Sequence, residues 1–169
     1  MRYCCIALLF LCEIMPYSLT RQSTLPIDKA ELWKAITQFD NINYELMPLA
    51  YMTYPAAAKT TALDMLPLHT TLFTSVILLF GYIPIDLHRL QLSDFKPEQG
   101  FWEHSRSLTH SAWKHTRTLQ ALPDGQTQLI DHVQFEPRLP LVGYLLLPIY
   151  CFMFGHRHKR LQKKYASKS

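Results

Sequence analysis

The chain has 169 residues, of which 49% are hydrophobic and 18% are charged, and its formal net charge at pH 7 is +4. This length and composition are typical of one folded domain with a buried core, and they exclude an intrinsically disordered chain. The positive charge is concentrated near the C-terminus, in residues 156–168. Such a cluster is typical of a solvated helix end, and a surface for anionic lipid or nucleic acid is the alternative.

The four cysteines are Cys4, Cys5, Cys12 and Cys151. Their spacing fits neither a zinc site nor a disulfide framework, which indicates a reducing compartment. We therefore expect a cytoplasmic protein, with peripheral membrane association as an open alternative.

Residues 1–14 form an apolar N-terminal extension that contains one arginine. The run resembles the apolar part of a signal peptide, but no small-residue cleavage site follows it, and Glu13 ends it before it could span a bilayer. Two interpretations stay open, an over-long start and a weak signal or membrane anchor. We expect a single domain over residues 15–165 and a basic tail at 166–169.

The first predicted elements are a strand and a short helix. Polar and apolar residues alternate over 17–24, which predicts a strand with one solvated face, and Pro26 ends it. Asp28 and Glu31 then fit an acidic capping box. The apolar positions that follow at helical spacing, and that predict an amphipathic helix, are Leu32, Trp33, Ile36 and Phe39.

The middle of the chain has weaker patterns. Residues 40–55 predict a second short helix and a turn into a strand, whereas 56–69 fit a loop or a frayed edge strand. Residues 73–83 are apolar almost throughout and too short to cross a membrane, so we expect a buried strand with a bulge at Gly81.

Strands are also predicted at 86–95 and 101–108, around a turn at 96–100. Two further strands flank the turn Pro123-Asp124-Gly125. A three-residue loop there brings apolar residues opposite one another, whereas a two-residue Asp-Gly turn does not. The pairs that the longer loop predicts are Leu119 with Leu129, Arg117 with Asp131, His115 with Val133, and Trp113 with Phe135.

Residues 139–154 are very apolar and lead into the basic C-terminal segment. We expect a long terminal helix in which Pro148 is either the first residue of the main helix or a kink within it. Three interpretations stay open: a core helix, a helix docked on a membrane surface, and a membrane span, although a span needs about 20 apolar residues. The candidates for a membrane surface are Leu146, Leu147, Tyr150, Arg157, Lys159 and Arg160.

Assembled, these elements predict an α+β helix-grip fold. A curved antiparallel sheet wraps around the long C-terminal helix, and two short helices follow the first strand. Only the terminal helix is long enough to cover the concave face of such a sheet. A cavity would lie between the sheet and this helix.

Four stretches resemble the START-like superfamily, also called SRPBCC. They are T-R-Q-S-T-L-P-I-D-K-A-E-L-W-K-A-I at 20–36, W-K-H-T-R-T-L at 113–119, the run to Pro137 that ends D-x-V-x-F-x-P, and P-L-V-G-Y-L with F-G-H-R-H-K-R-L in the terminal segment. The superfamily includes polyketide cyclases, lipid-transfer domains and pollen-allergen-like proteins, and the chain is most similar to a bacterial ligand-binding branch. The resemblance implies a hydrophobic ligand between sheet and terminal helix, and it carries over no catalytic residue.

The Arg117–Asp131 pair has two interpretations. It either stabilises the hairpin as a cross-strand pair, or Arg117, helped by His115, holds the polar end of an amphipathic ligand. The second interpretation predicts that Arg117→Met weakens ligand binding more than folding. The residues that we expect to line the cavity are Trp113, His115, Arg117, Leu129, Asp131, Val133, Phe135, Leu145, Ile149 and Phe152.

Other kinds of site have little support. His115 and His132 point to opposite faces in the predicted register, so we expect no metal site, and no sequence feature predicts a cofactor. No nucleophile elbow or phosphate-binding glycine loop occurs in the sequence. The basic tail lacks interleaved aromatic residues, so nucleic acid is not an expected partner, and we expect a monomer.

We therefore predict a non-enzymatic carrier or sensor of a hydrophobic small molecule such as a lipid, a quinone or a polyketide-like compound. The first alternative is a cyclase or hydratase that uses His115, Asp131 and Arg117 for acid-base chemistry. The second is a membrane-associated interaction protein whose cavity is filled by its own side chains.

Overall fold

The computed structural model describes residues 16–59 and 65–166. The predictions for residues 1–14 and for the tail after Ala166 lie outside this range. The elements in chain order are β1 (Tyr17–Leu25), α1 (Lys29–Ile36), α2 (Phe39–Leu46), β2 (Ala50–Met52), a 3-10 turn (Ala56–Lys59), β3 (Thr71–Leu79), β4 (Ile83–Lys96), β5 (Gly100–Ser107), β6 (His110–Ala121), β7 (Thr127–Pro137) and α3 (Pro140–Ala166).

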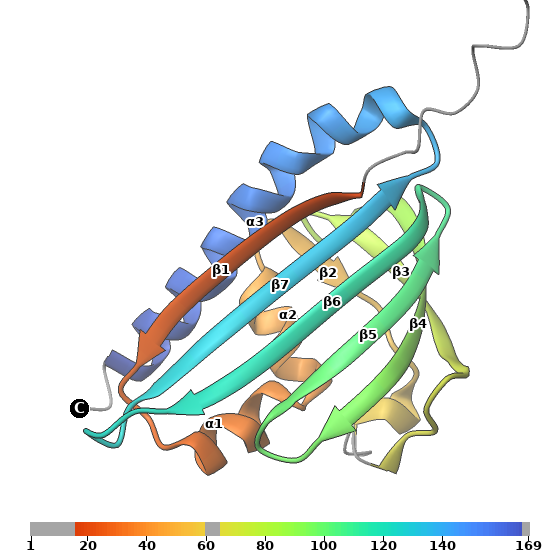
Figure 1. Cartoon of the computed structure of the whole chain (residues 1–169). Helices are drawn as coiled ribbons and strands as arrows, with labels where there is room; N and C mark the ends of the chain where they lie inside the picture. Colours follow the sequence, from red (N-terminus) through yellow and green to blue (C-terminus); the bar gives the residue numbers. More distant parts are fainter. Residues whose placement is uncertain (1–15, 60–64, 167–169) are drawn as a thin grey trace, which may run out of the picture.

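The seven strands form one antiparallel sheet in the order β1-β7-β6-β5-β4-β3-β2. In Figure 1 the sheet curves, and the long helix α3 runs along it next to β1. The two short helices α1 and α2 follow β1 and lie between that strand and β2 in the chain. The predicted helix-grip fold is confirmed.

The first helix starts and stops close to the predicted residues. The Asp28 side chain caps α1 by accepting a hydrogen bond from the Ala30 backbone N–H at 2.8 Å. The chain then extends at Gln38, so Phe39 begins α2 instead of continuing the apolar face of α1. Phe39 therefore does not belong to the first helix, as its spacing predicted, but its side chain is buried, at 2% exposed.

The structure corrects the prediction of one buried strand over 73–83. β3 ends at Leu79, Gly81 lies in the turn to β4, and Ile83 already belongs to β4. The irregularities in the β3–β4 pairing occur near Phe73 and Leu78 instead. Only Ser75 of β3 is buried, whereas Ile77 and Leu79 of the same strand line a cavity.

The β6–β7 hairpin forms with the predicted register. The four predicted pairs, from Leu119–Leu129 to Trp113–Phe135, are all observed. The Leu122 N–H donates to the Gln126 carbonyl at 2.8 Å, which leaves a three-residue loop. Gly125 adopts a φ of +69°, the left-handed conformation that such a loop needs.

The terminal helix α3 begins at Pro140 and contains Pro148 in its interior, so Pro148 does not start the main helix. A Cβ atom at Gly143 would lie 2.2 Å from the Tyr17 ring, so only glycine lets α3 pack this closely on β1. Among the described residues, none of the helices has the length and apolar character needed to cross a membrane.

Candidate functional site: a cavity between α2, α3 and strands β2 to β6

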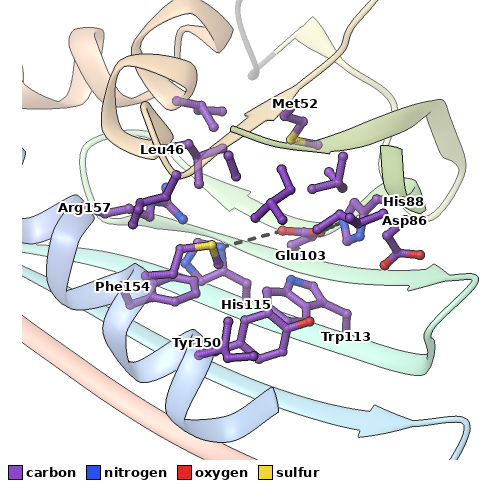
Figure 2. A pocket seen from close by; sticks show the side chains of 18 of the residues that line it. Leu46, Met52, Asp86, His88, Glu103, Trp113, His115, Tyr150, Phe154 and Arg157 are labelled. Carbon is purple, nitrogen blue, oxygen red and sulfur yellow. Dashed lines mark hydrogen bonds and ion pairs between the residues drawn. The ribbon is translucent and has the colours of Figure 1, made fainter. Parts of the chain in front are cut away.

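A cavity of about 500 Å³ lies between the concave face of the sheet and the helices α2 and α3. Its size falls in the range of small-molecule sites, roughly 300–1,000 Å³. Figure 2 shows side chains from both helices and from the sheet around this space. The apolar lining residues are Phe39, Ile42, Leu46, Leu49, Ala50, Met52, Ile77, Leu79, Phe80, Ile85, Leu90, Leu92, Phe101, Trp113, Leu146, Ile149, Phe152, Met153 and Phe154.

The mouth of the cavity is apolar. Phe80 and Ile85, near the β3–β4 turn, and Ile149 and Phe152 of α3 line the cavity and are also 48 to 66% exposed. An apolar molecule entering between this turn and α3 would therefore meet apolar side chains at the rim and inside.

One polar group in the wall is an ion pair between β4 and β5. Glu103 Oε1 lies 2.6 Å from His88 Nε2 and accepts a hydrogen bond of 2.5 Å from the Ser105 hydroxyl. Burial acts to raise the pKa of Glu103, but the charges of His88 and His115 and the hydrogen bond with His88 outweigh it and hold that pKa well below its ordinary value. Burial acts to lower the pKa of His88, but Glu103 outweighs it and raises that pKa.

His115, on β6, joins this ion pair to the interior. Its Nε2 atom lies 2.9 Å from Asp131 Oδ1, and its Nδ1 atom lies 3.6 Å from Glu103 Oε2. Burial acts to raise the pKa of Asp131, but Arg117 and His115 hold it well below the ordinary value. An ionised carboxylate only accepts hydrogen bonds, so His115 carries a proton on Nε2.

A second polar chain runs along the wall near the mouth. The Thr109 hydroxyl donates to Asp86 Oδ2 at 2.7 Å, and His110 Nδ1 lies 2.7 Å from the same hydroxyl. The other ring nitrogen of His110 lies 3.1 Å from the Tyr150 hydroxyl. Burial raises the pKa of Tyr150, and the charge of Asp86 adds to this effect. Tyr150 therefore stays a neutral hydroxyl at the cavity wall.

Next to the cavity lies an ionic cluster that consists of Glu45, Arg117, Asp131, Arg157 and His158, of which Arg157 also lines the cavity. Arg117 binds Asp131 through two hydrogen bonds of 2.7 Å and Glu45 through two of 2.9 Å. Arg157 donates twice to Glu45 Oε2, and His158 Nε2 lies 3.0 Å from Asp131 Oδ2. The side chains of Glu45, Arg117 and Asp131 are fully buried. Two guanidinium groups balance two carboxylates, so this part of the interior is filled and internally neutral.

Four of the ten predicted cavity residues line the cavity, and the other six do not. Trp113, His115, Ile149 and Phe152 line the cavity. Arg117 and Asp131 form the predicted cross-strand pair but belong to the ionic cluster, and Leu145 is 69% exposed. The closed core, where α3 packs on β6 and β7, contains the other three, Leu129, Val133 and Phe135.

The predicted membrane-surface residues also separate. Leu146, Tyr150 and Arg157 face inward and line the cavity. Leu147 is half-buried against the cluster around Trp113. The Arg160 guanidinium donates to the Tyr44 carbonyl at 2.6 Å and lies over the Tyr44 ring, whereas Lys159 is exposed. The exposed apolar side chains of α3 are instead Leu141, Tyr144, Leu145, Ile149 and Phe152.

Sequence reasoning missed the acidic and basic partners in and behind the wall. Glu103 had a usable signal, because it alternates with Phe101 and Ser105 on the inner face of β5. Glu45 had a weaker one, since it sits beside Leu46 and two positions after Asn43 in a helix that buries all three. The described residues contain no group of three or more histidine, cysteine or acidic side chains that could hold a metal ion.

Comparisons with known proteins agree with the fold. The chain is similar to a START superfamily protein from Mycobacterium smegmatis (7% identity, 90% of this chain and 99% of that one, TM-score 0.63). It is also similar to Ara h 8.0201 (13% identity, 90% of this chain and 99% of that one, TM-score 0.60). A third similar structure is DynU16, a protein of the dynemicin biosynthetic locus (12% identity, 88% of this chain and 48% of that one, TM-score 0.53). At these identities the likeness establishes a START-like fold alone.

At the sequence level, residues 23–165 match a domain of unknown function, DUF8410. No curated protein matches the chain.

Proposed function

We propose that this chain, which belongs to the DUF8410 family, binds and carries a hydrophobic small molecule in the cavity between its sheet and α3. The observation that carries the proposal is the cavity itself, which has a volume of about 500 Å³ and is lined mainly by apolar side chains. Burial of apolar ligand surface there would supply about 25 cal/mol per Å². The START-like fold supports the same conclusion, because the superfamily resemblance implies a ligand in this position.

Lipids, quinones and polyketide-like compounds all fit this description. Native mass spectrometry of the protein purified from its own host, followed by extraction and identification of the bound molecule, distinguishes them. We expect a stoichiometric hydrophobic compound that is released on denaturation. A protein that is empty in this experiment and that binds no hydrophobic compound when challenged would contradict the proposal.

The enzymatic alternative has less support. It assigned acid-base roles to His115, Asp131 and Arg117, but only His115 lines the cavity. The other two bind each other and Glu45, with no exposed side-chain surface. The alternative of a self-filled cavity is also less favoured, because the described side chains leave this volume open.

A second proposal concerns the rim of the cavity. The β3–β4 turn carries two exposed aromatic side chains, Tyr82 at 87% and Phe80 at 53%, and Phe80 lines the cavity together with Ile149 and Phe152 of α3. Large exposed apolar patches mark interaction sites, and apolar residues at a ligand entrance suit loading from a lipid surface. We propose that this rim docks on membranes, which makes the protein a peripheral carrier.

Flotation with lipid vesicles tests the docking proposal. The double variant Tyr82→Glu and Phe152→Glu should lower the vesicle-bound fraction about tenfold or more, because each aromatic side chain contributes about 1.5–3 kcal/mol when buried. Met65→Glu is the control, since Met65 is 78% exposed and does not line the cavity. Equal flotation of the double variant and the wild type would show that the rim is not the docking surface.

A further inference from the structure

The cavity wall contains a carboxylate oxygen, Glu103 Oε2, for which the described residues supply an ion pair but no hydrogen bond. Glu103 Oε1 is engaged by His88 and Ser105, at 2.6 and 2.5 Å. Glu103 Oε2 instead lies 3.6 Å from His115 Nδ1, which is too long for a hydrogen bond. Both atoms belong to residues that line the cavity, and Figure 2 shows the two side chains facing each other across its wall. Among the described residues, no side chain or backbone group forms a hydrogen bond with Glu103 Oε2.

The hydrogen-bonding character of this gap follows from the groups behind it. Asp131 accepts from Arg117, His158 and His115, so the ring of His115 is oriented with Nε2–H toward the interior. In neutral His115 the cavity-facing Nδ1 is then an acceptor, like Glu103 Oε2. When His115 is protonated, Nδ1 becomes a donor, but Glu103 Oε2 still accepts. In both forms the carboxylate oxygen can accept a hydrogen bond from a donor on the ligand.

The charges of the wall disfavour an anionic head group at this position. Asp86 and Glu103 are the carboxylates of the lining, and His88 and Arg157 are its basic partners. His88 is already paired with Glu103, and Arg157 donates two hydrogen bonds to Glu45. The positive charges are thus balanced by carboxylates of the protein, whereas a ligand carboxylate beside Glu103 Oε2 would face a like charge.

We infer that the natural ligand carries a hydrogen-bond donor, a hydroxyl or an amino group, on an apolar body, and that this group binds between Glu103 Oε2 and His115 Nδ1. A hydroxyl donates to Glu103 and accepts from protonated His115, and an amino group donates to both atoms when His115 is neutral. The site therefore selects hydrophobic alcohols, phenols or amines over fatty acids. This inference rests on the proposed binding of a hydrophobic molecule in the cavity.

Three probes of matched shape test it: 1-naphthol, 1-methylnaphthalene and 1-naphthoate, titrated into the full chain and followed by NMR. We expect 1-naphthol to bind about tenfold more tightly than 1-methylnaphthalene, because a hydrogen bond to a charged group adds about 1.5 kcal/mol or more. We expect 1-naphthoate to bind most weakly. Equal affinities of the three, or preference for 1-naphthoate, overturn this inference and leave cavity binding intact. No binding by any probe overturns both.

The variant Glu103→Gln sharpens the assignment to this wall. It should remove the preference for 1-naphthol over 1-methylnaphthalene and raise the affinity for 1-naphthoate, while 1-methylnaphthalene binds as to the wild type. Glu136→Gln, on the outer face of β7, is the matched control and should keep the wild-type order of the probes. A Glu103→Gln protein that keeps the tenfold preference places the donor site elsewhere and contradicts the inference. The ranking by the wild type decides the ligand class even if this variant does not fold.

Discussion

The two sides of the space beneath the sheet are built from different chemistry. Beneath β6, β7 and α3 the interior is filled by the ionic cluster, in which Arg117 and Asp131 have no exposed surface. Beneath β2 to β5 most of the lining side chains are apolar, and about 500 Å³ stays open. Long charged side chains that satisfy one another fill space and fix the position of α3. The apolar side chains of β2 to β5 leave a volume between the sheet and the helices unfilled, which leaves room for a ligand.

His115 is the link between these two sides. Its Nε2 atom contacts Asp131 in the ionic cluster, and its Nδ1 atom faces Glu103 in the cavity wall. The filled side therefore orients a group that the open side presents to a ligand. If this division is right, variants of the ionic cluster lower stability, and variants of the cavity wall lower affinity.

The largest effect is expected from Arg117→Met. This change leaves Glu45 and Asp131 buried without their shared guanidinium, so we expect the free energy of unfolding to fall by about 3–5 kcal/mol. Urea denaturation measures it, with Arg106→Met on the exposed face of β5 as a control that should change stability by less than about 0.5 kcal/mol. This revises the expectation that the same variant weakens binding more than folding. A stable variant with weak ligand binding would restore that expectation and break the comparison.

A smaller, pH-dependent loss is expected from His88→Asn. The raised pKa of His88 means that its pairing with Glu103 stabilises the fold fully below the ordinary value of 6.5 and is lost as the pH rises through the folded value. The lowered pKa of Glu103 means that the stabilisation is present above 4.5 and is lost as the pH falls through its folded value. The variant should therefore be about 1–3 kcal/mol less stable between pH 4.5 and 6.5, with a smaller difference at pH 9.

Thermal unfolding across this pH range is the measurement. His104→Asn is the control, because His104 is exposed on the outer face of β5. A His88→Asn difference that does not change with pH would mean that the His88–Glu103 contact contributes no ionic stabilisation.

The hairpin register could be predicted from the sequence, whereas the cavity wall could not. Strand parity and one three-residue loop determine the pairs from Leu119–Leu129 to Trp113–Phe135, and these contacts are close along the chain. The partner of Arg117 on α2, Glu45, lies 72 positions away, and nothing in local pattern connects the two. Which inner-face residues line a cavity depends on where α3 crosses the sheet. The alternation of side chains along β7 correctly predicts that Leu129, Val133 and Phe135 lie on the inner face of the sheet. It cannot predict that α3 covers them.

A larger side chain in the cavity wall should lower the affinity for a ligand. Ala50 of β2 lines the cavity, so Ala50→Phe places a ring in the space that the ligand would occupy. We expect the affinity for 1-naphthol, measured by NMR titration, to fall about tenfold or more. Stability should change by less than about 1 kcal/mol, because the ring enters open volume and does not displace packed side chains. Ala121→Phe, at the exposed end of β6, is the control. Undiminished affinity in Ala50→Phe would place ligand binding outside this cavity.

The smallest effect is expected at the edge of the ionic cluster. The Ser23 hydroxyl lies 2.7 Å from His158 Nδ1, and both residues are buried. Because Asp131 requires the proton of His158 on Nε2, neutral His158 accepts at Nδ1 and Ser23 donates to it. Ser23→Ala removes this one donor, so we expect a loss of about 1 kcal/mol in urea denaturation and unchanged affinity for 1-naphthol. Ser18→Ala, exposed on the same strand, should have no effect. If Ser23→Ala instead lowers affinity, the two sides of the interior are coupled through Asp131 and His115, and the ionic cluster takes part in binding.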